Sequence, residues 1–166
     1  MILLRKAKEE DIAIISALAE QIWPQTYAPY ISKEQLRYML NMMYNEGELL
    51  SQLQKGHTFL MSSENEKDVG FAGFSIIDIE NQGYKLHKLY VLPEMHGKGI
   101  GKILINEIVD IAVRNGGKTL QLNVNRNNNA KDFYLKIGFR IKETVDLDLG
   151  NGFFMNDYVM ELPIGY

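Results

Sequence analysis

The spacing of apolar residues changes along the chain from a helical period to a strand period. Between Lys8 and Ile22 the apolar residues recur at helical spacing, which predicts an amphipathic helix. The pair Trp23-Pro24 should end this helix, because proline disfavours helical geometry in the residue before it. A second helix is predicted to begin at Ser32, with four apolar residues on one face: Leu36, Met39, Leu40 and Met43.

Short apolar and β-branched runs indicate strands in the rest of the chain. These runs lie at Ile2–Arg5, Thr58–Ser62, Val69–Ile79, Tyr84–Val91 and Thr119–Val124. A helix with a single apolar stripe is predicted after Val91 and should end at Gly116-Gly117, and a shorter helix is predicted at Asn127–Ile137.

The C-terminal part of the chain predicts a β-hairpin. Residues 139–149 and 153–162 have strand character, and Gly150-Asn151-Gly152 between them is a strong turn signal. Strands and helices therefore alternate without a linker or a repeat. We expect a single mixed α/β domain over residues 1–166.

Composition and charge narrow the class of protein. The chain has 166 residues, 46% of them hydrophobic and 23% charged, with a net charge of -3. A nucleic-acid partner is not expected, because such an interface needs a concentrated basic face. The chain has no cysteine, which excludes disulfides and a cysteine nucleophile. The N-terminus lacks the apolar run of a signal peptide or membrane helix, so we expect a cytoplasmic protein with no membrane partner.

A glycine-rich segment stands between a predicted strand and a predicted helix. It reads His96-Gly97-Lys98-Gly99-Ile100-Gly101-Lys102, and we call it the glycine loop. Glycines allow positive φ and close approach of a ligand to the backbone. The free N–H groups and the dipole at a helix start favour an anion. The pattern predicts a site for a pyrophosphate, with Lys98 and Lys102 adding positive charge.

Two other nucleotide-binding motifs do not fit the glycine loop. A P-loop needs Ser or Thr after Gly-Lys to hold magnesium, but Ile103 follows Lys102. A dinucleotide fingerprint led by Gly97 needs glycine where Lys102 stands, and an acidic residue near Gly116. A purely structural turn is an alternative that the sequence leaves open.

The residues around this loop resemble a known family. The stretch Leu89–Lys102 is similar to the cofactor motif of the GNAT superfamily of N-acetyltransferases, in which Gln or Arg is followed by two residues, Gly, one residue, and Gly or Ala. His96 takes the place of the Gln or Arg, which weakens one side-chain contact with the cofactor and leaves the backbone contacts intact. The stretch Asn127–Phe139 is similar to a second motif of the family. The resemblance is close over Tyr84–Phe139.

The resemblance implies a fold, a cofactor and a reaction. The fold would be a single domain with a mostly antiparallel sheet of about six to seven strands and about four flanking helices. The reaction would move an acetyl group from acetyl-CoA directly to a primary amine of a small molecule or peptide. The implied cofactor-binding residues are Leu89, Tyr90, Val91, His96, Gly97, Lys98, Gly99, Ile100, Gly101, Lys102, Asn127 and Tyr134.

The same resemblance suggests how the acetyl transfer would be catalysed. Tyr134 would protonate the leaving thiolate, and the Val91 N–H would bind the developing oxyanion. His87 is the candidate base, because a histidine pKa lies near neutral pH. Each side chain also has an ordinary alternative. Tyr134 falls on a helical core stripe, and His87 fits a half-exposed strand position.

The acceptor side is less defined by the sequence. Trp23, Tyr27 and Tyr30 are candidates for the wall of the amine site, although such aromatics more often complete a hydrophobic core. The three histidines are too scattered to predict a metal site. A non-catalytic acyl-CoA sensor and a plain interaction module stay open as other functions. The apolar strands 139–162 would suit a homodimer contact.

Overall fold

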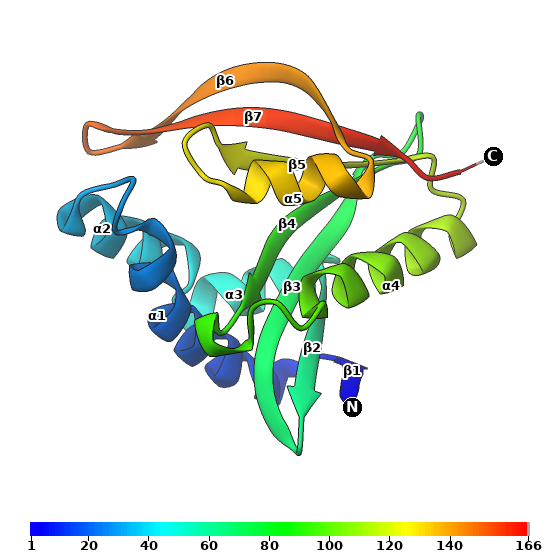
Figure 1. Cartoon of the computed structure of the whole chain (residues 1–166), viewed down its shortest axis with the longest axis horizontal. Helices are drawn as coiled ribbons and strands as arrows, with labels where there is room; N and C mark the ends of the chain where they lie inside the picture. The colour runs from blue at the N-terminus through cyan, green and yellow to red at the C-terminus, as the bar shows by residue number, and fades with distance from the viewer. Residues whose placement is uncertain (166) are drawn as a thin grey trace. The chain divides into compact units, whose positions relative to one another are not determined.

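The chain folds into strands and helices (Figure 1). Its residues form two compact units. The computed structural model describes residues 1–165. Unit 1 consists of Met1–Ser75 and Lys88–Glu107, and unit 2 of Ile76–His87 and the residues from Ile108 onward. Among the described residues, seven strands are hydrogen-bonded in the order β1-β2-β3-β4-β5-β7-β6. The expectation of one N-acetyltransferase domain over 1–166 stays a prediction.

Unit 1 carries the N-terminal strands and most of the helices. Its elements are β1 (Ile2–Lys6), a 3-10 turn (Glu9–Asp11), α1 (Ile12–Tyr27), α2 (Lys33–Met43), α3 (Glu46–Gln54), β2 (Thr58–Glu64), most of β3 (Lys67–Asp78), the end of β4 (Gly83–Val91), a 3-10 turn (Pro93–Met95) and the start of α4 (Ile100–Arg114). β1, β2 and β3 pair antiparallel. The β2–β3 turn holds Asn65 and Glu66 at positive φ, as a tight hairpin requires.

Side chains at the helix starts explain where α2 and α3 begin. The Ser32 hydroxyl accepts a hydrogen bond from the Gln35 N–H at 3.1 Å, which confirms the predicted start of the second helix. Asn45 Oδ1 accepts in the same way from the Glu48 N–H at 2.8 Å. The sequence pattern did not predict α3, although Asn45 is a good N-cap residue.

The predicted end of the first helix was wrong. α1 continues through Pro24 to Tyr27. A proline inside a helix loses one backbone hydrogen bond, at a cost of about 3 kcal/mol. Trp23, directly before the proline, and Tyr27, at the end of the helix, are only 2% and 8% exposed. Burial of two aromatic side chains offsets that cost, at about 1.5–3 kcal/mol for each large apolar side chain.

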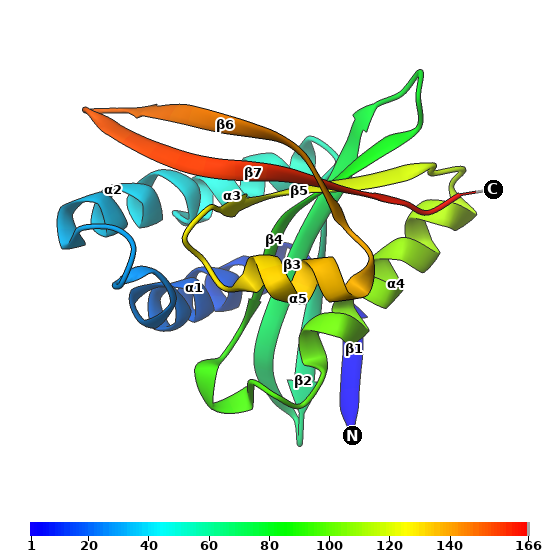
Figure 2. The same cartoon turned by 45° about the horizontal axis from the view of Figure 1, so that its top comes forward.

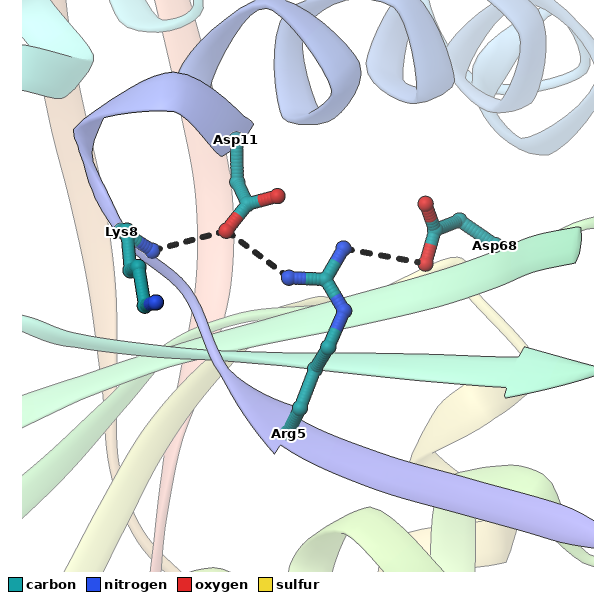
Figure 3. Close-up of polar contacts among 4 residues, drawn as sticks. All are labelled: Arg5, Lys8, Asp11 and Asp68. Atoms are coloured by element: carbon teal, nitrogen blue, oxygen red, sulfur yellow. Dashed lines mark hydrogen bonds and ion pairs between the residues drawn. The ribbon is translucent and has the colours of Figure 1, made fainter. Parts of the chain in front are cut away.

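A buried carboxylate fixes the segment between β1 and α1 (Figure 3). Asp11 Oδ2 accepts hydrogen bonds from Arg5 Nη1 and from the Lys8 N–H, both at 2.8 Å. Arg5 also reaches Asp68 on β3 at 3.4 Å. Asp11 is 5% exposed, and its hydrogen bond with Arg5 is the main cause of its lowered pKa. This network therefore ties the first helical segment to two strands of unit 1.

Asp11→Asn is expected to lower the free energy of unfolding by about 1–2 kcal/mol at pH 7, because a charge-assisted hydrogen bond is lost. The carboxylate has a lower pKa in the folded chain than in the unfolded chain. Its stabilisation is complete above the unfolded value of about 3.9 and disappears as the pH falls through the lowered folded value. Urea unfolding at several pH values measures both effects. Asp68→Asn, which removes only the longer contact to Arg5, should lower the free energy of unfolding by less. The prediction would be contradicted if the free energies of unfolding of Asp11→Asn and wild type differed by the same amount at every pH.

Unit 2 contains the C-terminal strands and the last helix. Its elements are the end of β3, the first part of β4, the end of α4, β5 (Thr119–Asn125), α5 (Ala130–Ile137), β6 (Arg140–Gly150) and β7 (Phe153–Pro163). β4 and β5 pair in parallel, from Gly83–Thr119 to Leu86–Leu122. β5 and β7 pair antiparallel, as do β6 and β7.

The predicted C-terminal hairpin and last helix are confirmed with small shifts. Figure 2 shows β6 and β7 as one long hairpin whose tip extends past β5. Its turn holds Gly150, Asn151 and Gly152 at positive φ. α5 begins at Ala130 rather than Asn127, because Asn128 first forms a turn through its side chain, and it ends at Gly138 with φ +123. β6 is an edge strand of the sheet and is mostly exposed. The homodimer contact expected for these strands stays a prediction.

Candidate active site

The glycine loop lies in unit 1 between the end of β4 and the start of α4. Gly97 has φ +83 and Gly99 has φ +78, and α4 begins at the next residue, Ile100. A Cβ atom built on either glycine would have no heavy atom within 4 Å, so both face open space. The first N–H groups of a helix have no partner within the helix. Positive φ, open space and a helix start together suit a bound anion.

The polar side chains of the glycine loop contact other parts of unit 1. His96 Nε2 lies 3.0 Å from the Val91 carbonyl oxygen, so the imidazole ties the start of the loop to the end of β4. Lys98 Nζ lies 3.5 Å from a Glu64 carboxylate oxygen, and both Lys98 and Lys102 are exposed. The lysine charges are therefore on the surface beside the loop.

A close approach of β3 positions the end of β4. The Leu92 N–H donates to the Val69 carbonyl oxygen at 2.8 Å. A Cβ on Gly70 would stand 2.8 Å from the Tyr90 carbonyl oxygen, so only glycine fits there. The predicted cofactor-binding residues Leu89, Tyr90 and Val91 are half-buried on this segment.

The aromatic residues proposed for the acceptor wall form a cluster around Tyr90. The Tyr27 and Tyr90 hydroxyls are 2.8 Å apart, and the Trp23 ring lies 4.6 Å from Tyr27 and 5.7 Å from Tyr90, centroid to centroid. Tyr30 follows the end of α1 and is half-exposed. The structure thus joins Trp23 and Tyr27 to the predicted cofactor strand. Both belong to the helix rather than to a loop.

A buried lysine that was not among the predicted site residues lies beside this cluster. Lys88 on β4 is 7% exposed, and its Nζ lies 5.2 Å from the centroid of the Tyr44 ring. Burial lowers the pKa of Lys88 to about 8, with Glu48 acting in the opposite direction. The signal was available, because Lys88 alternates with Leu86 and Tyr90 on the apolar face of β4. A charged residue there indicates either a special environment or a function.

Unit 2 holds the second predicted motif on and before α5. Tyr134 is 9% exposed, and its ring packs between Phe133 and Phe139 at centroid distances of 5.3 and 5.7 Å. Burial raises the pKa of the Tyr134 phenol, which therefore keeps its proton at neutral pH. Asn127 is exposed, and its N–H donates to Asn125 Oδ1 at 2.9 Å. The phenol is thus suited to donate a proton, while it also packs in the core of unit 2.

The candidate base lies on a polar face of the sheet in unit 2. His87 is half-buried and follows Leu86, the last residue of β4 that pairs with β5. Lys85 is on the same face of β4, two residues earlier. Burial lowers the pKa of Lys85, and the charge of Asp157 opposes that shift.

Asp157 on β7 is a second buried charged residue that was not among the predicted site residues. It is 5% exposed, and burial raises its pKa, although a hydrogen bond from Asn123 and the charges of Lys85 and Arg126 act against the shift. Strand alternation could have found it, because Asp157 lies between Met155 and Val159 at inward positions. A carboxylate at such a position is rarely buried unless it is paired.

Three comparisons with known proteins identify the family. A family model described as the acetyltransferase (GNAT) family matches residues 15–139. The spermidine N(1)-acetyltransferase of Thermoplasma acidophilum is 30% identical over 147 residues, which cover 85% of this chain and 89% of that protein. An uncharacterized N-acetyltransferase of Bacillus subtilis is 30% identical over 136 residues, which cover 81% of this chain and 78% of that protein.

A solved structure supports the same assignment. The crystal structure of PaiA N-acetyltransferase from Thermoplasma acidophilum in complex with coenzyme A matches with a TM-score of 0.83 and 29% identity, covering 98% of this chain and 99% of that chain. The predicted fold, a mostly antiparallel sheet of six to seven strands with flanking helices, is confirmed, with α3 as an additional helix. The family model covers most of the chain. The chain therefore belongs to the GNAT acetyltransferase family and is an N-acetyltransferase.

Proposed function

We propose that this protein transfers the acetyl group of acetyl-CoA to a primary amine of a polyamine such as spermidine. The glycine loop at the start of α4 supports acetyl-CoA as the donor, because Gly97 and Gly99 have positive φ and face open space at a helix start. The first N–H groups of a helix have no partner within it and suit a pyrophosphate. The similarity to a protein named spermidine N(1)-acetyltransferase supports a polyamine as the acceptor. Acetyl-CoA is a cytoplasmic metabolite, so we include a cytoplasmic location in the proposal. None of the helices in residues 1–165 has the length and apolar composition needed to cross a bilayer.

Three residues of this chain would take part in the acetyl transfer, each at a different step. Acetyl-CoA supplies a thioester, an activated form of the acetyl group. A primary amine has a pKa of about 10.4 and must lose a proton before it attacks the acetyl carbon. His87 would accept that proton, directly or through water. As the carbon–nitrogen bond forms and the carbon–sulfur bond breaks, Tyr134 would give the sulfur a proton, and the Val91 N–H would bind the carbonyl oxygen. The nitrogen would then lose its second proton, directly or through water, to the Tyr134 phenolate, which restores the phenol.

The test is release of free thiol from acetyl-CoA in the presence of amines. The panel should contain spermidine, spermine, a diamine, a free amino acid and a peptide with a free N-terminus. We expect the polyamines to give the highest kcat/KM. If only the peptide were acetylated, the acceptor would be a protein N-terminus rather than a polyamine. The reaction would still be acetyl transfer to an amine.

Binding measurements separate this proposal from the two other functions. An acyl-CoA sensor would bind acetyl-CoA and release no thiol with any amine. An interaction module would bind no acetyl-CoA at all. Titration calorimetry with acetyl-CoA, made before the amine panel, distinguishes the three.

A further inference from the structure

Two buried oxygen atoms in unit 2 have no hydrogen-bond donor. They are Asp157 Oδ1 on β7 and Asn123 Oδ1 on β5, and neither has a partner among residues 1–165. The two side chains are neighbours: Asp157 pairs with Asn125, two residues from Asn123, and the Asn123 amide lowers the pKa of the Asp157 carboxyl group. Buried polar atoms in folded proteins nearly always have partners. A pair of adjacent buried acceptors without partners therefore indicates a donor that residues 1–165 do not themselves provide.

Strand register places these oxygens on one face with other polar side chains. Lys85 pairs with Gln121, and Asn123 lies two residues further along β5 on the same face. Asp157 pairs with Asn125, two residues beyond Asn123. His87, two residues after Lys85, also belongs to this face. We call Asp157 and Asn123, with the two β4 residues Lys85 and His87, the polar face of unit 2.

The basic residues near Asp157 do not take up its free oxygen. The Arg126 guanidinium is held by Asp146 on β6. Lys85 influences Asp157 through its charge, and the two form no ion pair among the described residues. Burial raises the pKa of Asp157 in spite of these charges. A cation with its own N–H donors would stabilise the ionised carboxylate, whereas a water molecule brings donors without charge.

We propose that Asp157 and Asn123 bind the ammonium group of the amine acceptor. A protonated primary amine has three N–H donors and one positive charge, which match two acceptor oxygens and one carboxylate. The inference rests on the proposed function, since it assumes an amine acceptor. It adds the two residues that would select a positively charged acceptor. His87 shares this face, so the acceptor would be held where a candidate base is present.

Asp157→Asn tests this assignment, with Asp110→Asn as the control. The control removes the same charge from an exposed position of α4 in unit 2. Spermidine binding to the protein saturated with CoA is measured by calorimetry, and KM and kcat by thiol release. We expect Asp157→Asn to weaken spermidine binding and to raise its KM about tenfold, as loss of one charge-assisted contact predicts. CoA affinity should be unchanged, and Asp110→Asn should behave as wild type.

Stability separates a binding role from a structural one. Removal of a buried charge that has no ion pair among residues 1–165 should leave the Tm of Asp157→Asn at or above that of wild type. A lower Tm together with weaker CoA binding would overturn the inference in favour of a structural carboxylate. Unchanged spermidine binding in Asp157→Asn, or no spermidine binding by wild type, would also overturn it. Wild type that binds spermidine and releases no thiol would overturn the proposed function and leave the inference standing.

Discussion

Tyr134→Phe is expected to lower kcat about 100-fold, which is at the lower end of typical contributions from general acid–base catalysis. The physical reason is that the Tyr134 phenol keeps its proton at neutral pH, because burial raises its pKa. The phenol can therefore protonate a departing thiolate, and phenylalanine cannot. The ring packing against Phe133 and Phe139 is retained, so acetyl-CoA affinity and Tm should stay close to wild type.

The matched control for this substitution is Tyr84→Phe. Tyr84 is half-buried on β4 in unit 2, and the substitution again removes one phenol oxygen while keeping the ring. Steady-state thiol release with spermidine measures both variants. Full turnover by Tyr134→Phe with unchanged cofactor affinity would remove Tyr134 from the chemistry. It would then be a core residue of unit 2, as its place on the apolar stripe of α5 also allows.

Features determined by neighbouring residues were predictable from the sequence. The hairpin at Gly150-Asn151-Gly152 depends on turn chemistry within a few residues, and it lies where predicted. The start of α2 depends on Ser32 alone. The glycine loop likewise follows from a strand, three glycines and a helix in sequence order. Local signals of this kind do not require knowledge of what packs against them.

Features determined by distant residues were not predictable in the same way. α1 passes through Pro24 because Trp23 and Tyr27 are buried against Tyr90, far away in sequence. Asp157 and Asn123 meet only through the register of β5 and β7, which no local pattern gives. The contact of Lys88 with Tyr44 was also not predictable from local sequence, because it joins β4 to the segment between α2 and α3.

Gly99→Ala is expected to weaken acetyl-CoA binding by roughly 10- to 100-fold. Gly99 has φ +78, and its absent side chain would point into open space at the start of α4. An alanine methyl group there would obstruct an anion approaching the N–H groups, and its left-handed geometry would favour a shift of the loop. Loss of one hydrogen bond to a charged group costs about 1.5–3 kcal/mol, which corresponds to this range of affinity. Titration calorimetry with acetyl-CoA measures the effect.

Gly152→Ala separates backbone strain from ligand binding. Gly152 also has φ +78 and also has nothing within 4 Å of a built Cβ, but it lies in the β6–β7 turn. The two variants should therefore lose similar free energies of unfolding, about 1–2 kcal/mol from the left-handed geometry. Only Gly99→Ala should lose acetyl-CoA affinity. If it binds acetyl-CoA as well as Gly152→Ala does, Gly99 serves only the turn between β4 and α4, and the pyrophosphate must be bound by other residues of this chain.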